Sequence, residues 1–109
     1  MAYAYKVLGQ SAPSATTNTD VYTVGSGKQA IVSTITVANR SASSRTYRIA
    51  VRPAGATLAN QHYLAYDVAI PSNDATALTL GITLAATDVI TVYASTADLS
   101  FGIFGSEIS

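Results

Sequence analysis

A glycine-rich segment that ends in lysine, Gly25-Ser26-Gly27-Lys28, follows a short apolar run, where a phosphate-binding loop could lie. Such a loop needs Gly, four residues, Gly-Lys and then Ser or Thr, and it must open a helix whose N-terminus holds the phosphates. Here Tyr22 stands in place of the first glycine and Gln29 in place of the hydroxyl. The β-branched run that follows disfavours a helix. We therefore predict a hairpin turn and no nucleotide site.

His62 is the only histidine and the chain has no cysteine, so a Ser-His-Asp relay or an imidazole-rich metal site would depend on this one residue. We interpret His62 as a polar residue at the start of a strand. Four aspartates stand in or beside predicted turns, where carboxylates accept hydrogen bonds from backbone N–H groups: Asp20, Asp74, Asp88 and Asp98. Asp67 lies within a predicted strand, where we expect a salt bridge to a neighbouring strand.

These residues predict no catalytic group, no metal site and no cofactor, and we expect that the protein is not an enzyme. The aspartates lack the ligand density of a calcium loop. Paired-carboxylate hydrolysis stays open, because aspartates that are distant in the sequence can meet in space.

The one patterned charge feature is a set of arginines in a single predicted hairpin limb: Arg40, Arg45, Arg48 and Arg52. Strand alternation puts Arg48 and Arg52 on one outward face. A solvated face with cross-strand partners explains this pattern, and so does a subunit interface in which guanidinium groups pair with carboxylates of another chain. A nucleic-acid surface would need more basic residues interleaved with exposed aromatic residues, so we expect no nucleic-acid partner.

The composition suggests a surface that is covered by other protein. Only 11% of the 109 residues are charged and the formal net charge is zero, whereas an average soluble domain has about 25% charged residues. Such a surface repels little, which favours contact with a partner or with copies of the same chain. No apolar run approaches the roughly 20 residues that span a bilayer, and the first residues lack the features of a signal peptide. We therefore expect no membrane partner and synthesis in the cytoplasm.

Period-two alternation of β-branched, Leu and Tyr residues recurs between clusters of turn-forming residues, which predicts an all-β protein. The expected strands lie near residues 3–8, 21–24, 29–39, 45–52, 62–70, 76–84, 89–95 and 99–104. Eight short strands in one domain predict an antiparallel β-sandwich, immunoglobulin-like or jelly-roll-like. Because residues 11–19 have linker composition, we expect residues 1–19 to form an N-terminal arm with a connecting segment, and residues 20–109 to form the sandwich domain.

The same alternation predicts which side chains face the core. The expected inward sets are Ile31, Ser33, Ile35 and Val37; Tyr47, Ile49 and Val51; Leu64, Tyr66, Val68 and Ile70; and Leu78, Leu80, Ile82 and Leu84. The last two strands are apolar on both faces, so we expect them to be central or covered by another chain.

Several segments together resemble one known group of proteins: Val21–Ala30, Ser33–Arg40, Leu84–Ser95, and Leu99–Phe101 with Gly105 and Glu107. In these segments the chain is similar to small β-sandwich proteins encoded in the structural gene modules of tailed bacteriophages. The similarity covers nearly the whole chain from Val21 onward, and it consists of turns and strand patterns. In that group the first turn often reads Val-Pro-Ser-Gly, where this chain has Gly25 in place of proline. The resemblance implies a virion component without enzymatic activity, on heads, necks, baseplates or fibres.

We therefore expect a phage virion structural protein, made in the host cytoplasm, that forms a homo-oligomer and docks on the capsid, neck or tail. The expected contact residues are Tyr3, Tyr5 and Lys6 of the arm, which could add a strand to a neighbour's sheet, and the pair Arg48 and Arg52. The alternative is a receptor- or carbohydrate-binding module of a tail fibre or baseplate. That alternative needs exposed tyrosines with polar neighbours at one end of the sandwich, near residues 39–44 or 53–61.

Overall fold

The computed structural model describes residues 2–109, and nine strands account for most of this chain. The strands are β1 (Tyr3–Ser11), β2 (Thr19–Thr23), β3 (Gln29–Asn39), β4 (Arg45–Arg52), β5 (Tyr63–Ile70), β6 (Ala75–Leu78), β7 (Ile82–Leu84), β8 (Val89–Ala94) and β9 (Leu99–Ile108). Two short 3-10 turns, η1 (Pro53–Gly55) and η2 (Asn60–His62), lie between β4 and β5.

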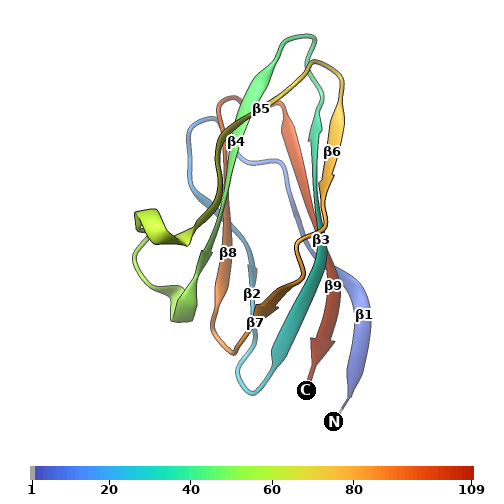
Figure 1. Cartoon of the computed structure of the whole chain (residues 1–109), viewed down its shortest axis with the longest axis vertical. Coiled ribbons are helices and arrows are strands. Elements are labelled where there is room, and N and C mark those ends of the chain that lie inside the picture. The colour runs from blue at the N-terminus through green and yellow to red at the C-terminus, as the bar shows by residue number, and fades with distance from the viewer. Residues whose placement is uncertain (1) are drawn as a thin grey trace.

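The strands form two antiparallel sheets that pack face to face (Figure 1). Sheet A has the order β1-β9-β3-β6, with β7 also paired to β3, and sheet B has the order β2-β8-β4-β5. The predicted antiparallel β-sandwich is thus confirmed. The expected strand near 76–84 is split into β6 and β7, because Gly81 between them has a φ of 61°, a left-handed conformation that ends regular strand geometry.

The segment expected to be an arm lies within sheet A. Of residues 1–19, residue 1 lies outside the described residues, and residues 3–11 form β1, which pairs with β9 along its length. This pairing is possible because β9 continues to Ile108, four residues beyond the predicted end at 104, so that Tyr3 lies opposite Ile108 and Lys6 opposite Gly105. β1 is consequently an edge strand of the sandwich rather than a separate arm.

The glycine-rich segment before Lys28 is a turn, but the predicted hairpin is wrong. The Lys28 N–H donates to the Gly25 carbonyl oxygen at 3.1 Å, and Gly27 has a φ of 74°. The strands on either side lie in different sheets, since β2 pairs with β8 and β3 pairs with β9. The turn therefore carries the chain from sheet B to sheet A.

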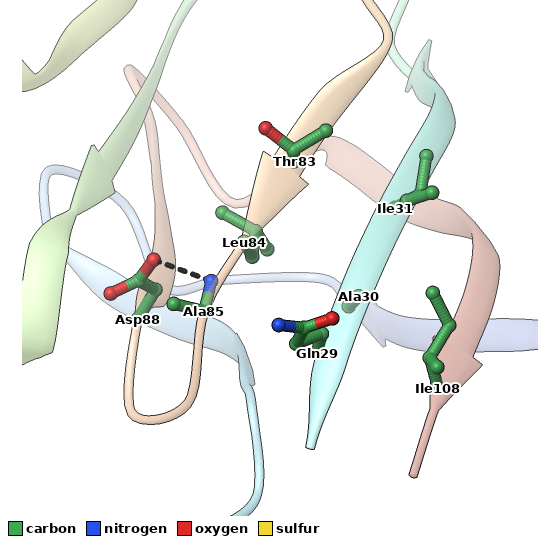
Figure 2. A pocket seen from close by; sticks show the side chains of 8 residues that line it. All are labelled: Gln29, Ala30, Ile31, Thr83, Leu84, Ala85, Asp88 and Ile108. Atoms are coloured by element: carbon green, nitrogen blue, oxygen red, sulfur yellow. Dashed lines mark hydrogen bonds between the residues drawn. The ribbon is translucent and has the colours of Figure 1, made fainter. Parts of the chain in front are cut away.

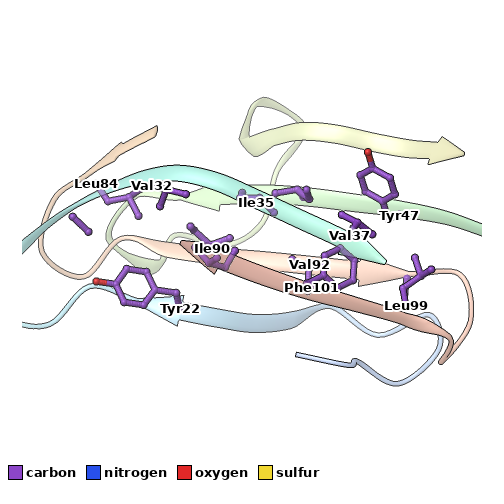
Figure 3. Close-up of a cluster of buried hydrophobic side chains, with 14 of the residues drawn as sticks. Tyr22, Val32, Ile35, Val37, Tyr47, Leu84, Ile90, Val92, Leu99 and Phe101 are labelled. Carbon is purple, nitrogen blue, oxygen red and sulfur yellow. The ribbon is translucent and has the colours of Figure 1, made fainter. Parts of the chain in front are cut away.

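The core lies between the two sheets (Figure 3). Its largest fully buried side chains are Ile35, Ile49, Ile70, Ile90, Leu99, Ile103, Val24, Val32, Val37 and Val92. Burying one such side chain contributes about 1.5–3 kcal/mol, so this layer is the main source of stability. Of the predicted inward residues, Ile35, Val37, Tyr47, Ile49, Ile70 and Leu84 are confirmed as buried.

The inward prediction is wrong in the first half of β3. The register between β3 and β9 shifts between Val32 and Thr34, which is a β-bulge that reverses the alternation. Ala30 and Val32 are buried as a result, while Ile31 is 43% exposed and Ser33 is exposed.

The inward prediction also fails for Leu64, Tyr66, Val68 and Leu80, which are exposed. In β5 the register with β4 shifts twice, and Asp67 has a φ of 52°, so simple alternation does not hold along this strand. Leu80 lies in the break between β6 and β7.

Candidate functional site

The outer face of sheet A carries an apolar surface next to the edge of the sheet, which we call the edge patch. It consists of the exposed Tyr3, Tyr5 and Val7 of β1 and Ile31 of β3, together with the half-buried Phe104 of β9. Tyr5 lies opposite Ser106, and Ser106 lies opposite Ile31, so these residues form one row across three strands. Tyr5 is 86% exposed, the largest value among the exposed large hydrophobic residues.

A hollow of about 450 Å³ lies within the edge patch, and its lining includes Tyr5, Ile31, Phe104 and Gly105. At Gly105 the backbones of β9 and β3 approach so closely that a Cβ atom would overlap the carbonyl oxygen of Ile31. Only glycine fits this approach without a shift of the backbone. The hollow is therefore built by the strand geometry around the bulge in β3.

A second hollow, of about 410 Å³, shares Ile31 with the first, and Figure 2 shows the residues that line it. Asp88 is the only ionisable residue in its lining. The Asp88 carboxylate accepts hydrogen bonds from the backbone N–H groups of Ala85 and Ala54, each at 2.8 Å. This aspartate fixes a turn, as the sequence predicted, and its oxygens are already bonded.

A polar cluster lies behind the edge patch, on the inner side of the β1–β9 pair. The Lys6 ammonium lies 2.8 Å from the Glu107 carboxylate, the Lys28 ammonium lies 3.6 Å from it, and the Tyr22 hydroxyl donates to Glu107 Oε2 at 2.7 Å. Hydrogen bonds from Lys6 and Tyr22, together with the two positive charges, lower the pKa of Glu107 to about 2. Burial and the neighbouring Glu107 raise the pKa of Tyr22.

This cluster has two consequences for the edge patch. Tyr22 belongs to sheet B and Glu107 to sheet A, so their hydrogen bond ties the sheets together at one end of the sandwich. Lys6, predicted as a contact residue, is paired within its own chain. The charge of Lys6 is thus matched within the chain, and Lys6 also contributes to the lining of the first hollow.

The outer face of sheet B is organised around Arg48. Arg48 Nε donates to Asp67 Oδ1 at 2.7 Å and Arg48 Nη2 donates to Asp67 Oδ2 at 3.3 Å, which confirms the cross-strand salt bridge expected for Asp67. The guanidinium carbon of Arg48 lies 4.2 Å from the ring centroid of Tyr66 and 4.2 Å from that of Tyr93, so the group is stacked between two aromatic rings. We call these four residues the arginine stack.

Arg52 is also held by its own chain. It donates from Nη2 to Asp20 at 2.9 Å and from Nε to the Thr91 hydroxyl at 3.0 Å, and its Nη1 donates to the carbonyl oxygens of Gly55 and Ala56. Two explanations were given for the arginine pattern. For Arg48 and Arg52 the structure contains the cross-strand partners that the first of them requires.

The five predicted contact residues do not form one site. Tyr3, Tyr5 and Lys6 lie on β1 at the edge of sheet A, and Arg48 and Arg52 lie on β4 in sheet B. The sequence prediction missed Val7, Phe104 and Ile31 as companions of the two tyrosines. The alternation that places Tyr3 and Tyr5 on one face also places Val7 there, so Val7 could have been predicted. The exposure of Ile31 depends on a bulge that has no local sequence signal.

The remaining polar candidates have structural contacts. His62 is buried, and its Nδ1 accepts a hydrogen bond from the Ala59 N–H at 3.1 Å. Within residues 2–109, no group of three or more acidic, histidine or cysteine residues is arranged to hold a metal ion. No helix in this part of the chain is long and apolar enough to cross a membrane.

No protein-family model matches the chain, and no match is found among curated proteins or solved structures. The resemblance to phage structural proteins therefore stands on the sequence segments alone.

Proposed function

We propose that the chain is a non-enzymatic structural protein of a tailed-phage virion, which self-associates and docks on the capsid, neck or tail through the outer face of sheet A. The observation that carries this proposal is the edge patch, in which exposed apolar side chains lie on and beside an unpaired strand edge. The phage assignment itself comes from the sequence resemblance.

The edge patch supports docking because soluble monomers rarely leave such a surface bare. Contiguous exposed apolar surface marks protein–protein contacts, and unprotected strand edges pair with other chains. A subunit that buries its edge patch against a capsid or tail binds the assembled particle in preference to the unassembled components. Such binding stabilises the assembly.

The polar groups support a structural role rather than catalysis. Glu107, Asp88 and Asp67 each have partners that fix strands or turns. Their chemistry holds the sandwich together, whereas an active site needs polar groups directed at a substrate.

The test is the copy number of the protein in purified particles of the phage that encodes it, measured by quantitative mass spectrometry against the major capsid protein. A simple fraction of the capsid copy number supports head decoration, and a ratio of a few per cent supports the neck, baseplate or fibres. Absence from purified particles contradicts the proposal.

A second candidate function is carbohydrate or receptor binding, which one observation on sheet B favours. Tyr63 and Tyr66 pack edge to face with ring centroids 4.9 Å apart, and together with Asn60 they line a hollow of about 230 Å³. Aromatic rings beside an amide suit a sugar ring. Binding on a glycan array that is lost in Tyr63→Ala and kept in Tyr5→Ala supports this function, and an array without reproducible binding contradicts it.

A further inference from the structure

We propose that two copies of this chain join through β1, which pairs with β1 of the second copy in antiparallel orientation about a two-fold axis at Tyr5. This inference rests on the self-association in the proposed function and names the strand, the register and the symmetry. The product is one continuous sheet that runs through sheet A of both copies.

The free edge of β1 can be assigned from its hydrogen bonds to β9. The Ala2 N–H donates to the Ser109 carbonyl at 2.8 Å, and the Ser109 N–H donates to the Ala2 carbonyl at 2.9 Å. Bonded and non-bonded pairs alternate along an antiparallel ladder. The backbone groups of Ala4 and Lys6 therefore point toward β9, and those of Tyr3, Tyr5 and Val7 point to the free edge.

Residues 3–7 carry only one of the features that usually protect an edge strand, the charged side chain of Lys6. Such strands carry charges, prolines or bulges that block pairing. Residues 3–7 contain no proline, and their one charged side chain, Lys6, is paired to Glu107 on the inner side. The bulge in β1 comes after Val7, so residues 3–7 keep a regular register with β9.

A second copy of the chain is the occupant that fits this edge. A two-fold contact uses the same segment on both sides. The net charge of zero and the internal pairing of Lys6 with Glu107 limit the repulsion between two copies at this edge.

The register follows from the strand itself. With the axis at Tyr5, each Tyr3 lies opposite Val7 and the two Tyr5 residues lie opposite each other, so all outward-pointing backbone groups of residues 3–7 find partners. Each Tyr3–Val7 pair places an aromatic side chain beside a β-branched one, a combination that favours cross-strand packing. A shift that moves the axis to Lys6 places two lysines side by side, and a shift to Ala4 removes Val7 from the pairing.

Cysteine cross-linking tests this register cleanly, because the chain has no cysteine of its own. Directly opposed residues in a bonded pair have Cα atoms about 5.5 Å apart, within the range of about 4.4–6.8 Å that a disulfide spans. Under mild oxidation at low protein concentration, we expect Tyr5→Cys to form a disulfide-linked dimer about tenfold faster than Ser72→Cys, because pairing raises the effective thiol concentration. Ser72 lies in an exposed loop and serves as the control.

Mixing Tyr3→Cys with Val7→Cys tests the register, and we expect the mixed dimer to form in preference to either homodimer. Equal rates for Tyr5→Cys and Ser72→Cys overturn the proposal, and so does preferential formation of the Tyr3→Cys homodimer.

Tyr5→Pro provides a second test that does not depend on oxidation. It removes an N–H that points to the free edge and leaves the bonds from Ala4 and Lys6 to β9 in place. We expect a dimer mass for the wild-type protein by light scattering, and a monomer mass for Tyr5→Pro with an unchanged β-sheet circular dichroism spectrum. A wild-type monomer at high micromolar concentration, or a Tyr5→Pro protein that is folded and dimeric, overturns the proposal.

These outcomes are separable from the virion test. A protein that is present in purified particles but does not cross-link through Tyr5→Cys refutes the β1 contact alone. A protein that cross-links but is absent from particles refutes the virion function alone.

Discussion

The two outer faces of the sandwich both carry tyrosines, but they use them differently. On sheet B, the rings of Tyr66 and Tyr93 enclose the Arg48 guanidinium, whose charge is matched by Asp67. On sheet A, Tyr5 is 86% exposed and its row neighbours across β9 and β3 are Ser106 and Ile31. An exposed tyrosine therefore indicates a docking surface only where the neighbouring residues leave it bare.

The edge strands of the two sheets differ in how regularly they pair with their neighbours. β5, an edge strand of sheet B, has two register shifts against β4 and a left-handed residue at Asp67. Residues 3–7 of β1 are regular against β9. Irregular edges resist pairing with other chains and regular edges accept it, so both comparisons favour sheet A as the contact surface that we propose.

The largest expected effect separates the inner and outer faces of sheet A. Ile35→Ala removes a fully buried side chain and should lower the free energy of unfolding by about 2–5 kcal/mol. Ile31 lies on the other side of the bulge, so Ile31→Ala should lower the free energy of unfolding by less than about 1 kcal/mol. Urea denaturation of both variants measures the difference. Similar losses at the two positions would mean that the bulge in β3 does not reverse the alternation.

A smaller effect distinguishes the arginine stack from the edge patch. Arg48→Ala removes the salt bridge to Asp67 and the stacking on two rings, and we expect a loss of about 1–2 kcal/mol in the free energy of unfolding. Tyr5→Ala should change the unfolding free energy of the monomer by less than about 0.5 kcal/mol. Denaturation of dilute protein, where self-association is absent, provides the measurement. A larger loss for Tyr5→Ala than for Arg48→Ala would reverse the assignment of the two faces.

A separate effect is the dependence of stability on pH that comes from Glu107. Its pKa is about 2 in the folded protein against an ordinary value of 4.5, so Glu107 binds a proton more readily in the unfolded chain. The stabilisation is complete above pH 4.5 and is lost as the pH falls toward 2. In Glu107→Gln, the fall in stability between pH 5 and about 2 should be shallower than in the wild type. Parallel stability curves for the two proteins would show that Glu107 does not carry this dependence.

The fold class followed from the sequence because alternation and turn residues are local signals. Tyr47 and Ile49 were placed correctly in the core because β4 keeps a regular register with β8. Ile31 was placed wrongly because its bulge arises from the approach of β3 to Gly105 of β9, which is distant in the sequence. The turn before Lys28 was mistaken for a hairpin for the same reason, since only the pairing partners reveal that its flanking strands lie in different sheets.

The candidate surface was predictable in part. The placement of Tyr3 and Tyr5 on one face follows from alternation, whereas the pairing of the predicted N-terminal arm with β9 was not predicted, because the added length of β9 was not evident. Asp67 was expected to bridge to a neighbouring strand and does so. The pairing of Lys6 with Glu107 joins opposite ends of the chain and depends on the β1–β9 register, which has no local signal.

Hydrogen exchange at individual backbone amides, compared at low and high protein concentration, tests most directly whether sheet A is the interacting side. We predict that the amides of Tyr3, Tyr5 and Val7 exchange more slowly as the concentration rises, because pairing bonds N–H groups that are free in the monomer. The amides of Leu64, Tyr66 and Val68 on β5 should not change. Protection that rises on β5 and stays constant on β1 would contradict the assignment of sheet A as the contact surface.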